Sequence, residues 1–293
     1  MLSLFAPWIE WLDWLRSERD ARRPETVSPG ASAGQVWLVG AGPGDPELIT
    51  VKALRLLQQA EVVIHDRLVA PALLKECASD ALLIDVGKRP GHHAVPQSGI
   101  EALLIHHALR GKRVVRLKGG DPFIFGRGGE ELATLKAAGI RTEVVPGITA
   151  AAGCAAAAGF PLTQRHVADS VCLTTAHYSD EQDHSNWAAL AADPARTLVF
   201  YMGLSQLTNI REQLIAHGMT AETPAALIEN GTTDSHRQVF CALNDIDQIA
   251  AREALRTPCL LIVGKVVALA GSGSVEVLHQ DPALAGQLDS PSS

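Results

Sequence analysis

The sequence predicts an α/β protein of two domains, each with a sheet flanked by helices. Short runs of Val, Leu and Ile alternate with segments of helical spacing, and glycine-rich turns separate them. A chain of 293 residues with 47% hydrophobic residues is long enough to bury two cores. Charged residues make up 19% and aromatic residues 4%, which is typical of a folded layered protein. The alternation favours mixed, mainly parallel sheets.

The five expected strands of the first half and its helices follow one another in regular order. We expect the first domain to span residues 35–160. Its expected strands are residues 36–39, 62–65, 82–86, 113–117 and 142–145, and its expected helices are residues 48–60, 100–109, 130–138 and 150–158.

The second half repeats this texture without a sequence repeat. We expect residues 161–169 to link the two domains and residues 170–272 to form the second one. The clearest helix, residues 207–217, ends at Gly218. The expected strands are residues 171–175, 197–201, 225–228, 238–242 and 259–263.

The two ends of the chain lie outside these domains. Residues 1–20 have the apolar stripe of an amphipathic helix, and a Pro-, Arg- and Gly-containing linker follows up to residue 34. We expect this extension to dock on its own protein or on a dimer partner. Residues 273–293 are expected to form a flexible tail.

Charge and cysteine content exclude several classes of protein. A formal net charge of -7 argues against a nucleic-acid partner, since such proteins carry a basic field. The five cysteines form no C-x-x-C pair and have no His at metal-ligand spacing, so we expect reduced thiols, no metal and a cytoplasmic protein. No apolar stretch reaches the ~18 residues of a membrane span. We therefore expect no membrane partner.

The turn after the first strand, Gly40–Pro46, stands where a dinucleotide-binding fingerprint would lie. Asp45 replaces the third glycine of that fingerprint, and Pro43 and Pro46 lack amides that a pyrophosphate needs. Asp66, after the second strand, is placed as a ribose-binding carboxylate would be, so a nicotinamide oxidoreductase stays open as an alternative. A purely structural tight turn would explain the glycines but not the prolines.

A second glycine-rich segment, Lys118–Glu131, also joins a strand to a helix. Its glycines allow a ligand to approach the backbone, Asp121 offers a carboxylate, and Arg127 offers a guanidinium. A mobile surface loop is the alternative, but Phe123 and Phe125 would be costly to leave in water. Two more polar segments, residues 146–150 and 161–165, follow a strand end and the domain junction. We expect all four to converge on one cleft between the domains.

Read in order, these segments resemble the uroporphyrinogen-III C-methyltransferases of the tetrapyrrole methylase superfamily. The resemblance runs from about residue 35 to residue 270. It rests on VWLVGAGPGDPELIT (Val36–Thr50), HDRLV (His65–Val69), VGKRPGHH (Val86–His93), RLKGGDPFIFGRGGEE (Arg116–Glu131), VVPGITAA (Val144–Ala151), GFPLTQR (Gly159–Arg165), FYMG (Phe200–Gly203), ENGT (Glu229–Thr232) and TPCLLIVGKVV (Thr257–Val267).

The resemblance implies a homodimer with S-adenosylmethionine bound in a deep cleft between two α/β domains. It implies two successive methyl transfers to uroporphyrinogen III, giving precorrin-2 and S-adenosylhomocysteine at the branch toward sirohaem, cobalamin and haem d1. The cofactor contacts of the family fall on Pro43, Gly119, Gly120, Asp121, Ile124, Thr149, Ala150, Met202 and Gly231.

The reaction that the resemblance implies needs positioning and proton transfer rather than a metal. A sulfonium methyl donor is already activated, so the protein chiefly aligns donor and acceptor. Because methylation of a ring carbon changes the number of protons on the macrocycle, we expect a base and an acid near it. By resemblance, Asp66 is the proton acceptor and Lys88 the donor. Glu130 is an alternative base, and Arg127 completes the expected catalytic set.

The implied substrate carries eight carboxylates, so an acidic protein must gather cations locally. Arg127 and Arg165 are the strongest candidates for substrate contact, with Glu130 orienting a guanidinium. Other candidates are Arg67, Arg89, Lys88 and the pair His92–His93. The alternative for any one of them is an exposed salt bridge of about 0–1 kcal/mol.

Some positions depart from the family pattern, and two alternatives remain beside the oxidoreductase. Many members have Tyr, Ser and His at the positions of His65, Ala151 and Gln164, and a TGH turn at residues 175–177. These differences put proton roles of Gln164 and His177 in doubt.

A methylase of a later corrin intermediate and a cofactor-binding regulatory protein are the two remaining alternatives; the latter would need neither an acid nor a base.

Overall fold

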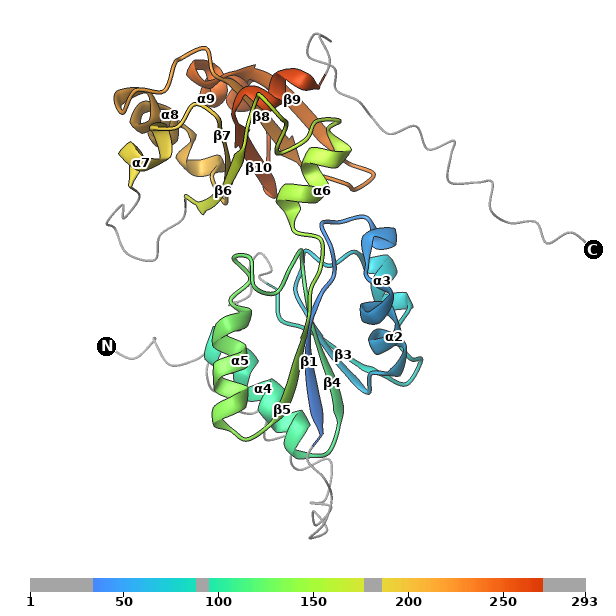
Figure 1. Cartoon of the computed structure of the whole chain (residues 1–293). Helices are drawn as coiled ribbons and strands as arrows, with labels where there is room; N and C mark the ends of the chain where they lie inside the picture. The colour runs from blue at the N-terminus through green and yellow to red at the C-terminus, as the bar shows by residue number, and fades with distance from the viewer. Residues whose placement is uncertain (1–33, 88–94, 177–185, 271–293) are drawn as a thin grey trace, which may run out of the picture. The chain divides into compact units, whose positions relative to one another are not determined.

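The computed structural model describes residues 34–87, 95–176 and 186–270. By its contacts the chain divides into two compact units, and neither is continuous in sequence. The first contains strand β1 up to Val39, Val51–Lys118 and Arg127–Val145, whereas Gly40–Thr50, Gly119–Gly126 and the chain from Pro146 onward belong to the second. Each unit has its own five-stranded sheet (Figure 1).

The first sheet is parallel and has the order β3-β2-β4-β1-β5. Its register pairs Val62 with both Leu82 and Val114, and Val36 with Thr142. The strands are β1 (Gln35–Gly40), β2 (Val62–His65), β3 (Leu82–Asp85), β4 (Arg113–Lys118) and β5 (Arg141–Val145).

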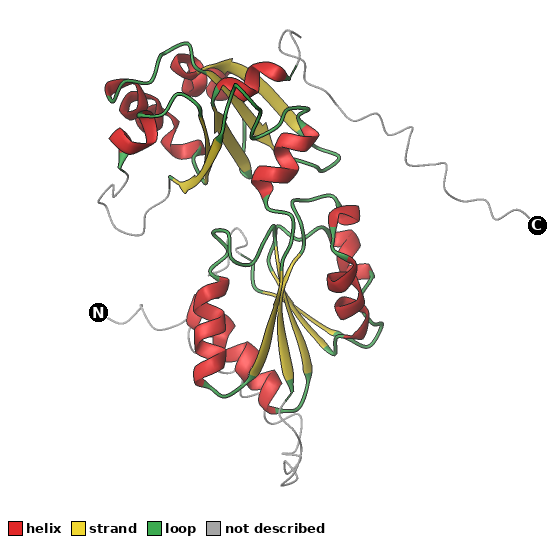
Figure 2. Ribbon diagram, in the orientation of Figure 1, coloured by secondary structure: helices red, strands yellow, loops and turns green. Residues whose placement is uncertain are grey.

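Helices cover both faces of this sheet, as parallel strands joined by crossovers require. Figure 2 shows α4 (Gln97–Leu109) and α5 (Gly128–Ala137) on one face, and α2 (Val51–Gln59) and α3 (Pro71–Lys75) on the other. The core under α4 and α5 is fully buried and includes Leu38, Ile64, Leu104, Val114 and Leu135.

The second sheet is mixed, with the order β6-β7-β10-β8-β9. Only β6 and β7 run parallel, and the other three pairs are antiparallel. The connection from β8 to β9 is too short for a crossover, so these neighbours must run in opposite directions. The strands are β6 (Ser170–Thr175), β7 (Arg196–Tyr201), β8 (Pro224–Glu229), β9 (Arg237–Ala242) and β10 (Cys259–Val263).

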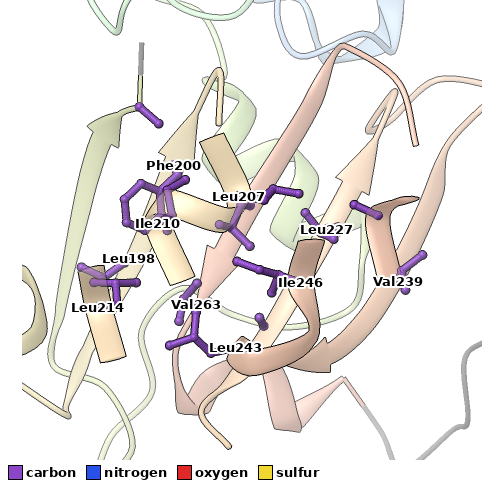
Figure 3. Packing of buried hydrophobic residues seen from close by; sticks show 14 of the residues in the cluster. Leu198, Phe200, Leu207, Ile210, Leu214, Leu227, Val239, Leu243, Ile246 and Val263 are labelled. Atoms are coloured by element: carbon purple, nitrogen blue, oxygen red, sulfur yellow. The ribbon is translucent and has the colours of Figure 1, made fainter. Parts of the chain in front are cut away.

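The faces of the second sheet bury two different cores. Leu198 and Phe200 of β7 pack with α7 (Trp187–Ala191), α8 (Leu207–Ala216) and α9 (Ile246–Arg252) (Figure 3). Val199, between them, points to the opposite face, where α6 (Ala150–Ala157) and the 3-10 helix η4 (Lys265–Leu269) pack. This alternation is the period of two that a strand imposes.

The α/β class and its two sheets are confirmed, and the local differences have physical causes. Of the expected helix 48–60, residues 51–59 form α2. The chain before it forms a separate 3-10 turn, η1 (Pro46–Leu48), in which Asp45 Oδ1 accepts the Glu47 amide at 2.8 Å, and Ile49 then has an extended backbone that separates the two elements. Helices α3, α7 and α9 were not expected, since they are too short to show periodicity. Two further 3-10 turns, η2 (Leu204–Gln206) and η3 (Leu243–Asp245), precede α8 and α9.

The sequence also predicted the two ends of the chain, the limits of the domains and the linker between them. The expected N-terminal helix and C-terminal tail lie outside the described residues. The expected domain limits, residues 35–160 and 170–272, stay a prediction. In the expected linker Gln164 bridges to Ala168. No helix among the described residues is long and apolar enough to cross a membrane.

Candidate functional site

The two glycine-rich loops expected from the sequence are hydrogen-bonded to each other in the second unit. The Gly42 amide donates to the Gly120 carbonyl at 3.2 Å, and the Gly120 amide donates to Gly42 at 2.7 Å. A Cβ on Gly40 would lie 2.6 Å from both Gly120 O and the Gly147 Cα. Three backbone segments therefore approach so closely that only glycine fits at this point.

Asp121 ties the third expected loop to this pair. Its Oδ1 accepts the Phe123 amide at 2.8 Å, and its Oδ2 accepts the Gly147 amide at 3.0 Å. One carboxylate thus fixes both the turn that it begins and the strand end that opens helix α6. Charge-assisted bonds of this kind are about twice as strong as neutral ones.

The Gly40–Pro46 turn also docks on the loop after β8. The Asp45 amide donates to Thr232 Oγ1 at 3.0 Å, and the Thr232 amide donates to Nδ1 of buried His236 at 3.2 Å. Because Nδ1 accepts, Nε2 of His236 carries the proton and donates to Gln238 at 3.1 Å. Pro43 packs on α6, where a Cβ on Gly153 would lie 2.5 Å from the proline ring.

Tyr201 holds the start of helix α6 from the end of β7. Its hydroxyl lies 2.6 Å from the Thr149 hydroxyl and accepts the Ala151 amide at 2.9 Å. The Phe125 ring packs against it with centroids 4.7 Å apart. Burial raises the pKa of Tyr201, so the phenol stays protonated at neutral pH. Tyr201 was not among the site residues predicted from the sequence.

Large apolar side chains are exposed beside these loops. Phe123, Phe125 and Met202 are 53%, 40% and 49% exposed. Phe125 and Met202 also have positive φ angles of 52° and 54°, a conformation that costs a non-glycine residue about 1–3 kcal/mol and is concentrated at ligand sites. Exposed apolar groups on a strained backbone indicate a binding surface.

All nine residues expected to contact a cofactor belong to the second unit. They come from the four segments just described and from the end of β7. The set is Pro43, Gly119, Gly120, Asp121, Ile124, Thr149, Ala150, Met202 and Gly231. The hydrogen bonds described above bring together the loops that carry these nine residues. Their role in cofactor binding stays a prediction.

The expected substrate and catalytic residues are distributed differently. Asp66, Arg67, Arg127 and Glu130 belong to the first unit, and Arg165 lies exposed in the second. Lys88, Arg89, His92, His93 and His177 lie outside the described residues.

Arg127 and Glu130 form an exposed bidentate ion pair at the start of α5. Arg127 Nε donates to Glu130 Oε1 at 2.9 Å and Nη2 donates to Oε2 at 2.7 Å. This hydrogen bonding raises the pKa of Arg127 and holds the pKa of Glu130 below its usual range. Glu130 is therefore ionised at neutral pH and orients the guanidinium, but it is a weak base.

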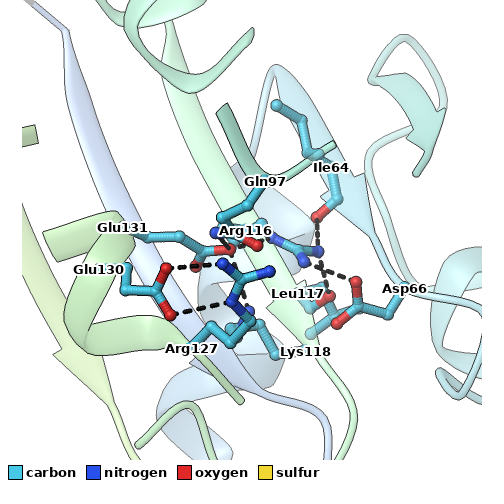
Figure 4. Close-up of polar contacts among 9 residues, drawn as sticks. All are labelled: Ile64, Asp66, Gln97, Arg116, Leu117, Lys118, Arg127, Glu130 and Glu131. Carbon is cyan, nitrogen blue, oxygen red and sulfur yellow. Dashed lines mark hydrogen bonds and ion pairs between the residues drawn. The ribbon is translucent and has the colours of Figure 1, made fainter. Parts of the chain in front are cut away.

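A buried group of charges lies beside Asp66 in the first unit (Figure 4). Arg116 Nη2 donates to Asp66 Oδ1 at 2.5 Å, and Arg116 Nε donates to Glu131 Oε1 at 3.1 Å. Arg116 Nη1 donates to the Ile64 and Leu117 carbonyls at 3.3 and 3.2 Å. Arg116 is 2% exposed, so protein groups rather than water satisfy this guanidinium.

Lys118 and Gln97 complete the group around Glu131. Lys118 Nζ and Gln97 Nε2 donate to Glu131 Oε1 at 3.0 and 3.3 Å. Glu131 Oε2 is buried without a hydrogen-bond partner among the described residues. Burial, and then the charge of Arg116, lower the pKa of Lys118.

The sequence contains a signal for this buried group of charges. Arg116 and Lys118 alternate with apolar residues in a strand expected to be covered by helices on both faces. A charge in such a strand is buried and therefore requires a partner.

Two observations concern metal-ligand side chains and thiols in the described part of the chain. No group of three or more His, Cys, Asp or Glu side chains there could hold a metal ion. Burial raises the pKa of the Cys154 thiol to about 12, so it stays protonated.

The model of the family "Tetrapyrrole (Corrin/Porphyrin) Methylases" matches residues 35–247. The chain belongs to this family. A siroheme synthase of Pseudomonas fluorescens (strain Pf0-1) is 58% identical over 238 residues, which are 81% of this chain and 51% of that protein. A siroheme synthase of Stutzerimonas stutzeri (strain A1501) is 57% identical over 83% of this chain. The chain spans about half the length of these curated relatives.

Solved structures of methyltransferases share the fold of this tetrapyrrole methylase. The uroporphyrin-III C-methyltransferase of Thermus thermophilus, complexed with S-adenyl homocysteine, is 38% identical with a TM-score of 0.69. That match covers 80% of this chain and 100% of the Thermus chain. A cobalt precorrin-4 methyltransferase is 28% identical over 82% of this chain and 99% of its own, with a TM-score of 0.73.

Proposed function

We propose that this tetrapyrrole methylase uses S-adenosylmethionine to convert uroporphyrinogen III to precorrin-2 by two successive C-methylations. The observation that carries the proposal is the junction of Gly42, Gly120 and Gly147, which gathers the loops bearing the expected cofactor residues. The likeness to the Thermus enzyme, which was solved with the demethylated product of this donor, supports it.

The residues around the junction fit S-adenosylmethionine. Gly120 has a φ of 67°, and a Cβ there would meet nothing closer than 3.9 Å, so a ligand can approach its backbone. The exposed side chains of Phe125 and Met202 suit an adenine ring, whereas backbone groups near Thr149 suit its polar edges. When bound, S-adenosylmethionine supplies an activated methyl group on its sulfonium centre.

Charged side chains supply proton transfer and bind the carboxylates of the substrate. Asp66 is one-third exposed, and its side-chain hydrogen bond within the described part of the chain is made through Oδ1. Its other oxygen, Oδ2, is the one that accepts a proton from the macrocycle. Lys88 is the proposed donor. Arg67, Arg89, Arg127 and Arg165 bind substrate carboxylates. Arg127, presented by Glu130, is held ready for a bidentate contact.

The assembly and cellular setting belong to the same proposal. We propose a cytoplasmic homodimer that acts on a small molecule, with no nucleic-acid or membrane partner. The net charge of -7 supports the absence of a nucleic-acid partner. The siroheme synthases that match it support a role at the branch toward sirohaem, with cobalamin and haem d1 as further products of the same intermediate.

The purified chain, given S-adenosylmethionine and anaerobic uroporphyrinogen III, is expected to yield a dimethylated product and S-adenosylhomocysteine. Mass spectrometry of the product measures both steps. Asp66→Asn should lower kcat by about 10²-fold or more, as loss of a general base does. Arg127→Ala should raise KM for the tetrapyrrole, while Arg211→Ala, which breaks an ion pair with Asp247 elsewhere, should leave kinetics unchanged.

Two results would overturn the proposal. Binding of NAD(P) without any methyl transfer would support the oxidoreductase alternative. Turnover of a later corrin intermediate but not of uroporphyrinogen III would place the chain elsewhere within the family.

A further inference from the structure

Arg116 projects from β4 toward the face that α4 and α5 cover, together with Val114 and Lys118. Its hydrogen bonds to the described residues go to groups of the first unit, and they fix the guanidinium from three sides. Glu131 holds Nε, two backbone carbonyls hold Nη1, and Nη2 is left for Asp66 (Figure 4). Because a guanidinium is planar and rigid, fixing two of its nitrogens fixes the third.

The contact between Arg116 and Asp66 joins a fully buried group to a partly exposed one. Arg116 is 2% exposed, whereas the Asp66 side chain is 32% exposed. Oδ1 of Asp66 is held at 2.5 Å from Nη2, so the orientation of the carboxylate, and with it the direction of Oδ2, is set from inside the protein. An exposed aspartate without such a contact would rotate freely.

We propose that Arg116 is a positioning residue that orients the Asp66 carboxylate for proton transfer during methylation. The proposal deepens the proposed function and rests on it. Arg116 is buried and does not touch the substrate, and its whole effect on turnover passes through Asp66.

The rest of the buried group keeps Arg116 in place. Glu131, 0% exposed, accepts from Arg116, Lys118 and Gln97 through a single oxygen, Oε1. Two carboxylates balance two cations, so the group carries no net formal charge and can remain buried. Lysine could not replace Arg116, because one ammonium cannot reach Asp66, Glu131 and two carbonyls with fixed geometry.

Stability alone is a weak reason for this arrangement. Buried ion pairs contribute little compared with well-packed apolar residues of similar volume. The buried group of charges nevertheless extends to the partly exposed carboxylate of Asp66, which is the proposed proton acceptor. The rate of a reaction depends strongly on the orientation of the reacting group, and a displacement of 1 Å can lower the rate by about 10²-fold.

A double-mutant cycle on the full chain tests this dependence. Arg116→Gln, Asp66→Asn and the double variant are compared for kcat and KM with uroporphyrinogen III, and for S-adenosylhomocysteine affinity by calorimetry. We expect Arg116→Gln to lower kcat about 10- to 100-fold with unchanged cofactor affinity. In the Asp66→Asn background the same substitution should lower kcat no further.

Arg116→Lys carries the test if Arg116→Gln does not fold, since it keeps the charge and most of the volume. We expect it to remain folded and still to lose about 10-fold in kcat. Arg211→Lys and Arg211→Gln, at the ion pair with Asp247, are matched controls with unchanged kcat.

The outcomes distinguish the inference from the function on which it rests. Wild-type kcat for Arg116→Lys, or an equal loss for Arg116→Gln in both backgrounds, would overturn the positioning role. Wild-type kcat for Asp66→Asn would instead remove the proposed role of Asp66, and no methyl transfer by the wild type would remove the proposed function.

Discussion

Tyr201 and Thr149 join the end of strand β7 to the first turn of helix α6, with their hydroxyl oxygens 2.6 Å apart. The same phenol accepts the Ala151 amide, which has no partner within the helix at that position. The side chain of a second-sheet strand thus fixes the backbone at Thr149 and Ala150, two of the expected cofactor contacts.

Tyr201→Phe should weaken binding of S-adenosylhomocysteine while the protein stays folded. Loss of two hydrogen bonds of about 1 kcal/mol each should raise Kd about 3- to 10-fold, because the start of α6 is no longer fixed. Calorimetry measures the change. Thr208→Ala, which loses a hydroxyl bond to Asp247 outside these loops, should leave Kd unaltered. An unaltered Kd in Tyr201→Phe would show that the contact is structural only.

Gly231→Ala should destabilise the protein, and a second substitution should restore it. The added Cβ would lie 2.2 Å from Cys154 Sγ, an overlap that typically costs about 1–3 kcal/mol. In Gly231→Ala/Cys154→Ala the sulfur is gone and the nearest atoms lie 3.3 Å away. Thermal unfolding of both variants and of Cys154→Ala alone measures the coupling. Strictly additive losses would contradict the overlap.

Elements with a strong pattern were predictable almost to the residue. Cys259–Val263 is a continuous apolar run and forms β10 over those same residues. Helix α4 begins three residues before the expected residue 100, because its first turn, Gln97–Gly99, carries no apolar signal. Pairing directions in the second sheet were not predictable, since apolar periodicity identifies strands but not their neighbours.

The candidate site was predictable where a motif marks it and not where packing creates it. The glycines of both loops indicated close backbone approach, and Gly42 and Gly120 do meet. Tyr201 and Arg116 belong to strands, and their importance comes from partners 50 residues away in the sequence. A motif contains no information on such long-range partners.

Glu131→Gln should destabilise the protein more than Lys118→Met. Removing the Glu131 charge leaves Arg116 and Lys118 buried with a single anion, Asp66, and breaking such a group costs about 3–5 kcal/mol. In Lys118→Met, Glu131 keeps Arg116 and Gln97, and the lowered pKa of Lys118 shows that its charge is already disfavoured by burial. Urea unfolding measures both, and the reverse order would contradict the assignment of charges.

Glu61→Gln should lose a small stabilisation that depends on pH. The Glu61 carboxylate accepts the Arg113 amide at 3.0 Å, and this bond holds the pKa of Glu61 below its usual 4.5. The stabilisation is therefore complete above pH 4.5 and is lost as the pH falls through the lower pKa of the folded state. Because the side chain is about one-third exposed, we expect about 0.5 kcal/mol.

The difference in unfolding free energy between wild type and Glu61→Gln, measured by urea at neutral and acidic pH, checks this sign. It should shrink on acidification. Glu212→Gln, at an exposed pair with Arg211, is the control for the removal of a surface carboxylate. A difference that grows toward low pH would contradict the assigned hydrogen bond.

The segments of the two compact units alternate along the chain, and this limits how the protein can be divided into fragments. The loops Gly40–Thr50 and Gly119–Gly126 are interleaved with segments of the other unit. A fragment expressed from Pro146 onward would lack both loops, and with them Pro43, Gly119, Gly120, Asp121 and Ile124. A single exchange of sequence therefore cannot replace one whole unit without also dividing the other.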